Sequence, residues 1–302
     1  MLKSSIRNSP RLLVRKTKRF LFFRQRSITL SHEGYRIVAP SKHTIKSISK
    51  IEPFRNQFLR TTAKHFIASE RNHVIDVGAN IGDTALTILA GSLVEPKFTL
   101  VEPSNFFLKY LRLNVCYINQ WEIVEKVVSP NYPITDLNSE MHYWGGTAQI
   151  LSSETSLISQ SQMISLHSLV TTRTGLIKLD CDGLDTQIFQ TFLQNSNYLP
   201  VVFLENTITD RKSYVDSINV TTKALEVGYR FAAIARSDGL LIWGGEIGLD
   251  NLQDIFRMQL NFRHMNQEHL LYHTDLLLVP RALEIEFQTF LFDLRKQQDS
   301  LF

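Results

Sequence analysis

The stretch His73-Val-Ile-Asp-Val-Gly-Ala-Asn-Ile-Gly-Asp-Thr84 decides the fold of this chain. Its first residues form a short apolar run that predicts a buried strand. Gly78 and Gly82 then allow a sharp turn whose backbone can approach a ligand closely. The apolar run of residues 85–90 predicts a helix, which Asp83 or Thr84 can cap at its start. The positive end of that helix faces the turn and suits a carboxylate or a phosphate.

A second strand, predicted at Phe98–Val101, ends in an acidic residue. Glu102 follows Gly82 by 20 residues, about the separation at which a carboxylate is expected to bond the ribose of a nucleoside. The glycine spacing argues against a dinucleotide site, because the fingerprint G-x-G-x-x-G needs a glycine where this chain has Asn80. The sequence therefore predicts a nucleoside site. The alternative is an ordinary strand–helix turn whose glycines serve packing.

The other apolar runs predict a doubly wound, mostly parallel α/β sheet. Three more strands are expected at residues 123–128, 175–181 and 201–204, with helical runs between them. The remaining expected elements are a strand pair or lid at 28–51, a helix at 51–70, an irregular segment or hairpin at 141–150, a hairpin at 229–243, a helix at 251–271, a strand at 274–279 and a helix at 281–302. We predict a basic N-terminal extension (1–50), a main domain (51–282) and a C-terminal helix (283–302).

Charge separates the N-terminal arm from the rest of the chain. Residues 1–32 hold nine Lys or Arg and no Asp or Glu, which leaves 24 basic against 29 acidic residues elsewhere. A mildly acidic body carries no nucleic-acid footprint, so no nucleic-acid partner is expected. The two cysteines show neither disulfide nor metal spacing, which fits a reducing cytoplasm.

The basic arm, residues 1–26, also carries short apolar runs between its charges. Such a segment can lie on an anionic membrane surface, which vesicle sedimentation at low and high salt would test. The alternatives are a loosely docked extension and a transit peptide. No apolar run reaches the roughly 18 residues that a membrane-spanning helix needs.

Four segments of this chain occur in a recognisable order and spacing between residues 74 and 280. They are Ile75–Gly82, Val101–Ser104 with the Leu111–Asn114 segment after it, Leu166–Leu169 and Ile177–Gly183. In these segments the chain resembles the FkbM family of S-adenosylmethionine (SAM)-dependent methyltransferases, over about two thirds of its length. The first segment is shared by many methyltransferases. The last segment, Lys-x-Asp-x-acid-Gly, is the one that narrows the resemblance to the FkbM family.

The resemblance implies a seven-strand sheet of class I methyltransferase type that binds SAM, with residues 51–282 as the methyltransferase domain. The implied cofactor-binding residues are Asp76, Gly78, Asn80, Gly82 and Glu102. The implied reaction is methylation of a hydroxyl on a small-molecule or glycan acceptor, such as a sugar, a glycolipid or a natural product. The family usually has Glu where this chain has Asp182 and Asp185, and a carboxylate one methylene shorter reaches less far.

Methyl transfer to a hydroxyl needs alignment of the reactants and a group that takes the proton. We expect Asp180 or Asp182 to be that base, with Lys178 orienting it. The alternative is that both aspartates only cap the following helix. A metal is a further alternative, because Asp180, Glu205 and Asn206 end adjacent strands and carry the oxygen ligands that Mg²⁺ prefers.

A second class of function is a catalytically idle SAM-binding or scaffold protein that the arm recruits to a membrane. An enzyme needs Asp180 and Glu205 to line an open pocket, whereas an idle protein can have them packed shut. A nicotinamide enzyme is disfavoured because position 80 is not glycine.

Overall fold

The computed structural model describes residues 26–46, 54–130, 138–144, 147–157, 163–181, 183–264 and 273–300. Two predictions fall outside this range: the membrane contact of the basic arm, of which only Arg26 is described, and the role of Asp182. Within the described residues no helix combines the length and the apolar character that crossing a membrane requires.

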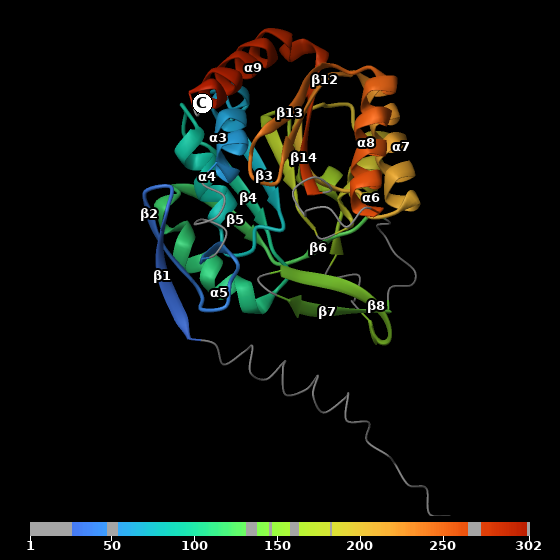
Figure 1. Cartoon of the computed structure of the whole chain (residues 1–302). Helices are drawn as coiled ribbons and strands as arrows, with labels where there is room; N and C mark the ends of the chain where they lie inside the picture. The colour runs from blue at the N-terminus through green and yellow to red at the C-terminus, as the bar shows by residue number, and fades with distance from the viewer. Residues whose placement is uncertain are drawn as a thin grey trace, which may run out of the picture.

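One sheet forms the centre of the molecule and contains eight strands over the described residues (Figure 1). Their order is β13-β12-β14-β11-β10-β3-β4-β5. The neighbours from β11 to β5 are parallel, whereas β14 runs antiparallel to both β11 and β12, and β13 runs antiparallel to β12. The strands are β3 (His73–Val77), β4 (Lys97–Val101), β5 (Gln120–Val124), β10 (Thr174–Leu179), β11 (Val201–Thr207), β12 (Tyr229–Arg236), β13 (Leu241–Glu246) and β14 (His273–Pro280).

This sheet confirms the predicted doubly wound, mostly parallel class. The resemblance implied seven strands, and β13 adds an eighth at one edge through the hairpin predicted at residues 229–243. The strand order reverses between β3 and β10, because the chain lays β4 and β5 on one side of β3 before it returns to the other side. In sheets of this kind the ligand crevice lies outside the carboxyl ends of the strands at the reversal.

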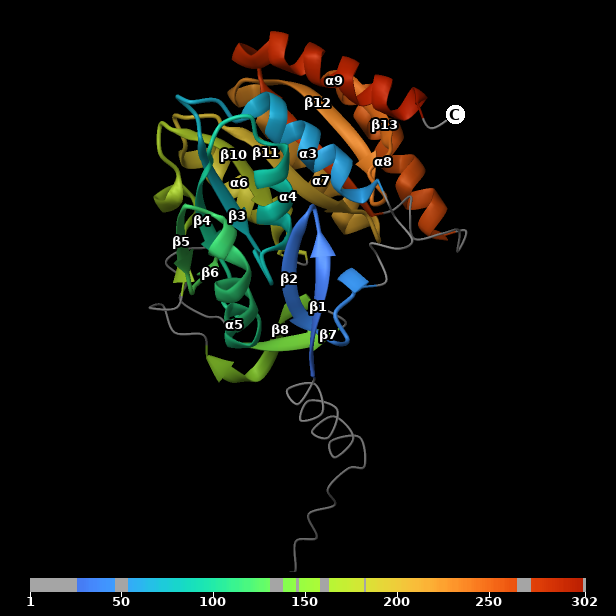
Figure 2. The same ribbon diagram turned by 90° about the vertical axis from the view of Figure 1, so that its left-hand side faces the viewer.

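Helices cover both faces of the sheet (Figure 2). On one face, Phe58 and Phe66 of α3 pack against Phe290 of α9, in a core that also includes α4 and α5. On the other face, Phe189 of α6 contacts Tyr229 edge to face in a core shared with α7 and α8. The helices are α3 (Arg55–Phe66), α4 (Asp83–Gly91), α5 (Asn105–Asn114), α6 (Asp185–Asn195), α7 (Arg211–Val227), α8 (Leu249–His264) and α9 (Glu284–Asp299).

A strand pair precedes the sheet. β1 (Ser27–His32) and β2 (Tyr35–Pro40) are antiparallel, as one of the two readings of residues 28–51 predicted. Ile37, Ala39 and Ile45 are buried in the same core as α3 and α5. Residues 27–45 therefore pack against the main body, although the domain division at residue 51 stays a prediction.

Several predicted boundaries differ from the structure. The strand predicted at 123–128 is split by the charged pair Glu125-Lys126: β5 ends at Val124, and β6 (Val127–Val128) pairs instead with β9 (Met163–Ile164). The helix predicted at 51–70 corresponds to the shorter α3, and the helix predicted at 281–302 corresponds to the shorter α9. The segment at 141–150 is a hairpin of β7 (Asn138–Trp144) and β8 (Thr147–Leu157), one of its two predicted forms.

Close contact between α3 and α4 gives a test of this packing. Alanine usually stabilises a helix by about 1 kcal/mol relative to glycine. At Gly91, however, a Cβ would lie 2.4 Å from the backbone oxygen of Arg60, so Gly91→Ala should lower the free energy of unfolding by about 1–3 kcal/mol. Urea titration measures this change. Gly245→Ala is the control, because its Cβ would meet nothing closer than 3.4 Å; equal losses in both variants would contradict the packing.

Candidate functional site

The turn after β3 has a backbone that few residues adopt. Gly78, Asn80 and Gly82 have φ angles of 80°, 50° and 87°, all in the left-handed region. At Gly78 a Cβ would lie 1.9 Å from the carbonyl oxygen of Asp180, so only glycine lets the turn touch the end of β10. The Gly78 N–H donates to the carbonyl oxygen of Val101 at 3.0 Å. The turn is therefore held between the ends of β10 and β4.

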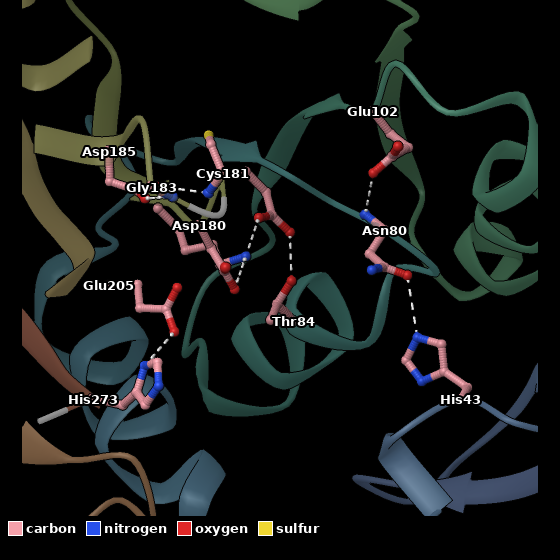
Figure 3. A network of polar contacts seen from close by, with 12 residues as sticks. His43, Asn80, Thr84, Glu102, Asp180, Cys181, Gly183, Asp185, Glu205 and His273 are labelled. Carbon is pink, nitrogen blue, oxygen red and sulfur yellow. Dashed lines mark hydrogen bonds and ion pairs between the residues drawn. The ribbon is translucent and has the colours of Figure 1, made fainter. Parts of the chain in front are cut away.

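The start of α4 differs from the prediction. Its N-cap is Gly82, without a side-chain cap bond, so the caps predicted at Asp83 and Thr84 are wrong. The Thr84 hydroxyl donates instead to Asp76 Oδ2 at 2.7 Å (Figure 3). Asp83 lies in the first turn, where its charge complements the positive helix end. Thr84 thus fixes the buried carboxylate of β3 rather than the helix backbone.

Glu102 lies at the carboxyl end of β4 and is 4% exposed. Its Oε2 accepts from the Asn80 N–H at 2.9 Å (Figure 3). Its Oε1 accepts from the Ser104 N–H at 2.7 Å. Burial raises the pKa of Glu102 to about 7, although these two N–H groups lower it. Each carboxylate oxygen has two lone pairs, so each retains an acceptor position for a ligand.

A buried lysine joins β3 and β10. Lys178 Nζ lies 3.2 Å from Asp76 Oδ1 and 3.1 Å from Asp180 Oδ2, and the side chain is 3% exposed. Burial lowers the pKa of Lys178, but Asp180 and Asp76 outweigh it and raise the pKa above the ordinary value. The ammonium therefore stays charged and cannot act as a base. Its contact with Asp180 is the geometry expected for an orienting residue, and that role stays a prediction.

Asp76 is fully buried between these partners. Burial raises the pKa of Asp76, whereas the Lys178 ammonium and the Thr84 hydroxyl lower it. A buried carboxylate of this kind depends on its cation, because an unpaired charge is costly away from water.

Strand alternation places two more carboxylates on the face of the sheet that carries Asp76 and Lys178. Glu205 on β11 and Asp275 on β14 are directly opposite partners, and Phe203 and Leu277, two residues away from each, lie in the core under α3 and α9. Burial raises the pKa of Asp275 to about 8, and Arg55 is the largest opposing influence. The sequence analysis missed Asp275, although a carboxylate within an apolar strand was a usable signal.

Asp180 does not cap the helix that follows it. The N-cap of α6 is Leu184, with no side-chain cap bond, and the Asp180 carboxylate contacts Lys178 instead. The capping alternative is therefore wrong for Asp180. Its side chain is 42% exposed, so it is accessible from the strand ends.

Asp185 binds the backbone N–H groups of Cys181 and Gly183. Its carboxylate accepts from the Cys181 N–H at 2.7 Å and from the Gly183 N–H at 3.2 Å (Figure 3). Burial, followed by Asp180 and Glu205, raises the pKa of Asp185 to about 7. The shorter side chain at this position is thus occupied with the local backbone.

A histidine of the N-terminal segment reaches the glycine turn. His43 Nδ1 accepts from the Ile45 N–H at 3.2 Å, which leaves the ring proton on Nε2 in the neutral form. Nε2 then donates to Asn80 Oδ1 at 3.2 Å (Figure 3). The sequence analysis missed this residue because nothing links positions 37 residues apart in the chain.

The three oxygen ligands considered for a metal do not gather at one point. Among the described residues no group of three or more His, Cys, Asp or Glu could hold a metal ion. Asn206 Oδ1 accepts from Ser217 Oγ of α7 at 2.9 Å, on the opposite side of β11 from Glu205. The Asn206 side chain is therefore bonded to α7. Asp180 and Glu205 are left without the third oxygen ligand that the metal hypothesis needs.

Comparisons find similarity at the level of architecture. Neither a family model nor a curated protein matches the sequence, so membership in the FkbM family stays a prediction. Solved structures that match include cofactor-bound Rv0187 from MTB (11% identity, TM-score 0.41, covering 91% of this chain and 93% of that one). Others are a SAM-dependent methyltransferase from Geobacter sulfurreducens in complex with S-adenosyl-L-homocysteine (12%, 0.40, 80% and 99%) and the O-methyltransferase TomG from Streptomyces achromogenes in complex with SAM (9%, 0.37, 76% and 82%). Similarity this low does not identify a family.

The buried ion pair gives a prediction about stability. Lys178→Met should lower the free energy of unfolding by about 3–5 kcal/mol, because Asp76 is then left without its cation. Adding Asp76→Leu to this variant should recover part of the loss, since the unpaired carboxylate is removed. Urea titration measures both. Lys212→Met, which breaks the exposed pair with Asp216, should change little; a loss as large as that of Lys178→Met would contradict the prediction.

Proposed function

We propose that this chain is a SAM-dependent methyltransferase that transfers the methyl group to a hydroxyl. One observation carries the proposal: the buried Glu102 carboxylate is bonded to the glycine turn through Asn80 and retains acceptor positions at the end of β4. The two hydroxyls of a ribose can donate to such a carboxylate. Gly78 brings the turn against Asp180, so the nucleoside end of the site adjoins Asp180 at the end of β10.

The charges at the strand ends also suit this cofactor. When bound, SAM supplies a methyl group on a positively charged sulfonium. Asp76, Asp180, Glu205 and Asp275 lie at the strand ends on one face of the sheet; Asp76 and Asp180 contact Lys178, and Glu205 acts electrostatically on Asp275. An acidic excess favours a cation by direct charge attraction. Alignment of cofactor and acceptor by the strand ends can contribute about 7–11 kcal/mol.

The exposure of two carboxylates favours an enzyme over an idle scaffold. The side chains of Asp180 and Glu205 are 42% and 32% exposed, so they are not packed shut. A carboxylate within reach of an acceptor hydroxyl can contribute about 10²- to 10⁴-fold in rate. The finer features of the proposal are FkbM membership, a sugar, glycolipid or natural-product acceptor and a cytoplasmic location with peripheral membrane contact. They rest on the sequence.

The first test concerns the ribose contact. Glu102→Ala should weaken SAM binding by about 1.5–3 kcal/mol, the range for hydrogen bonds to a charged group. Isothermal calorimetry measures the affinity. The control is Glu125→Ala, which removes an exposed carboxylate paired with Arg112 and should leave SAM affinity unchanged. Unaltered affinity in Glu102→Ala would refute the assignment of this residue.

The second test uses the raised pKa of Glu102. With a pKa of about 7, the free protein carries this side chain mostly protonated below neutral pH. Ribose hydroxyls that donate to the ionised carboxylate favour its deprotonated form. The affinity for SAM should therefore fall up to about tenfold per pH unit below 7 and level off above it. Calorimetry across this range checks the profile, and Glu102→Gln should flatten it; a pH-independent wild type would contradict the linkage.

A further inference from the structure

A cavity of about 400 Å³ lies at the carboxyl ends of β10 and β11, between the first turns of α6 and α7. Much of its lining is uncharged and polar, with Thr186, Gln187, Thr207, Thr209, Asn206 and Ser213. Glu205 also lines it, on the strand next to Asp180, and neighbouring strands lie about 4.8 Å apart. Because Asp180 touches Gly78, the cavity opens about one strand away from the proposed cofactor turn.

Most of the carboxylates in the described lining are already engaged. Asp185 binds the loop N–H groups of Cys181 and Gly183. Asp210 caps α7 by accepting from the Ser213 N–H at 2.8 Å.

Asp216 is paired with Lys212 at 2.6 Å. Glu205 differs from these three, because its contact with His273 Nδ1 is 3.7 Å long, beyond a hydrogen bond. Glu205 is therefore the carboxylate best placed to bond a ligand in this cavity (Figure 3).

A buried amide provides an independent indication of a ligand. Asn206 lines the cavity and is 1% exposed, yet its Nδ2 has no hydrogen-bond partner. The Ser217 hydroxyl is within 2.9 Å of both Asn206 Oδ1 and the Ser213 carbonyl oxygen, but it has only one proton to donate. Whichever way the amide is turned, one of its two polar atoms lacks a protein partner. The site thus offers a buried hydrogen-bonding position at the residue that follows Glu205, on the opposite side of β11.

The charges of the cavity select against anions. The positive ends of α6 and α7 already face Asp185 and Asp210, and the Lys212 ammonium is paired with Asp216. The negative Glu205 would repel a phosphate or a carboxylate. Hydroxyl and amide side chains suit a ligand with many neutral hydroxyl groups.

We propose that this cavity binds the methyl acceptor, a neutral polyhydroxylated compound, and that Glu205 is the catalytic base for its reacting hydroxyl. This inference rests on the proposed methyltransferase function. In the step, an oxygen lone pair forms the new O–CH₃ bond while the S–CH₃ bond breaks and its electron pair stays on sulfur. The hydroxyl proton passes to the Glu205 carboxylate, so charge and atoms balance.

The test uses the full-length protein, methyl-labelled SAM and a panel of neutral hexosides and cyclic polyols, each beside its phosphate or uronic-acid analogue. Neutral acceptors should be methylated at least about tenfold faster than their anionic analogues. Glu205→Gln should lower kcat about 100-fold at neutral pH and leave SAM affinity within about twofold. Glu226→Gln, on α7 but outside the cavity lining and paired with Lys223, is the matched control and should keep most of the rate. If Glu205→Gln does not fold, Glu205→Asp replaces it and should lower kcat more than it changes KM.

Each failure has its own signature. Equal or faster methylation of the anionic analogues would overturn the acceptor class, and full activity in Glu205→Gln, or an equal loss in Glu226→Gln, would overturn the base. SAM binding without transfer to any neutral probe would also count against this inference while leaving the cofactor assignment standing. A wild type that neither binds SAM nor transfers label to any probe would instead refute the proposed function.

Discussion

The contact on which the site depends is the buried Lys178 ammonium between the carboxylates of Asp76 and Asp180. Replacing a buried ion pair by apolar residues is often neutral or stabilising, so stability alone does not explain this arrangement. Geometry explains it better. Lys178 and Asp76 are opposite partners on β10 and β3, the two strands between which the sheet order reverses. Their contact fixes the two strand ends that border the crevice.

Around this contact the sheet concentrates negative charge at its carboxyl edge. Burial, together with the neighbouring Asp180 and Glu205 carboxylates, raises the pKa of Asp185 to about 7 and that of Asp275 to about 8. Such an edge attracts a cation more than a neutral molecule. Under the proposed function the attraction acts on the charged sulfonium reactant and vanishes once sulfur becomes neutral. The site therefore favours the reactant cofactor over its demethylated product.

Local sequence patterns predicted the parts of the site that short segments define. The apolar run before Gly78, the left-handed glycines and the acidic end of β4 each follow from a few adjacent residues, and the structure contains all three. Prediction failed where the partner is distant. Thr84 was expected to cap α4, but tertiary structure places the Asp76 carboxylate within reach of its hydroxyl. Asn80 is bonded by His43, and Asp275 meets Glu205 only through antiparallel pairing of β14. Such contacts depend on topology, which no local pattern encodes.

The same contacts divide the roles of two neighbouring carboxylates. A base at Asp180 would have to accept a proton while its carboxylate lies 3.1 Å from the Lys178 ammonium. Protonation would break the Lys178–Asp180 ion pair, which helps to align β3 with β10. Glu205 is in no such ion pair with a lysine, and its contact with the His273 ring is 3.7 Å long. Asp180 is therefore better suited to hold the architecture and Glu205 to change its protonation state. A sheet that anchors one strand end with a lysine and leaves the next carboxylate unanchored can exchange a proton without disturbing the crevice.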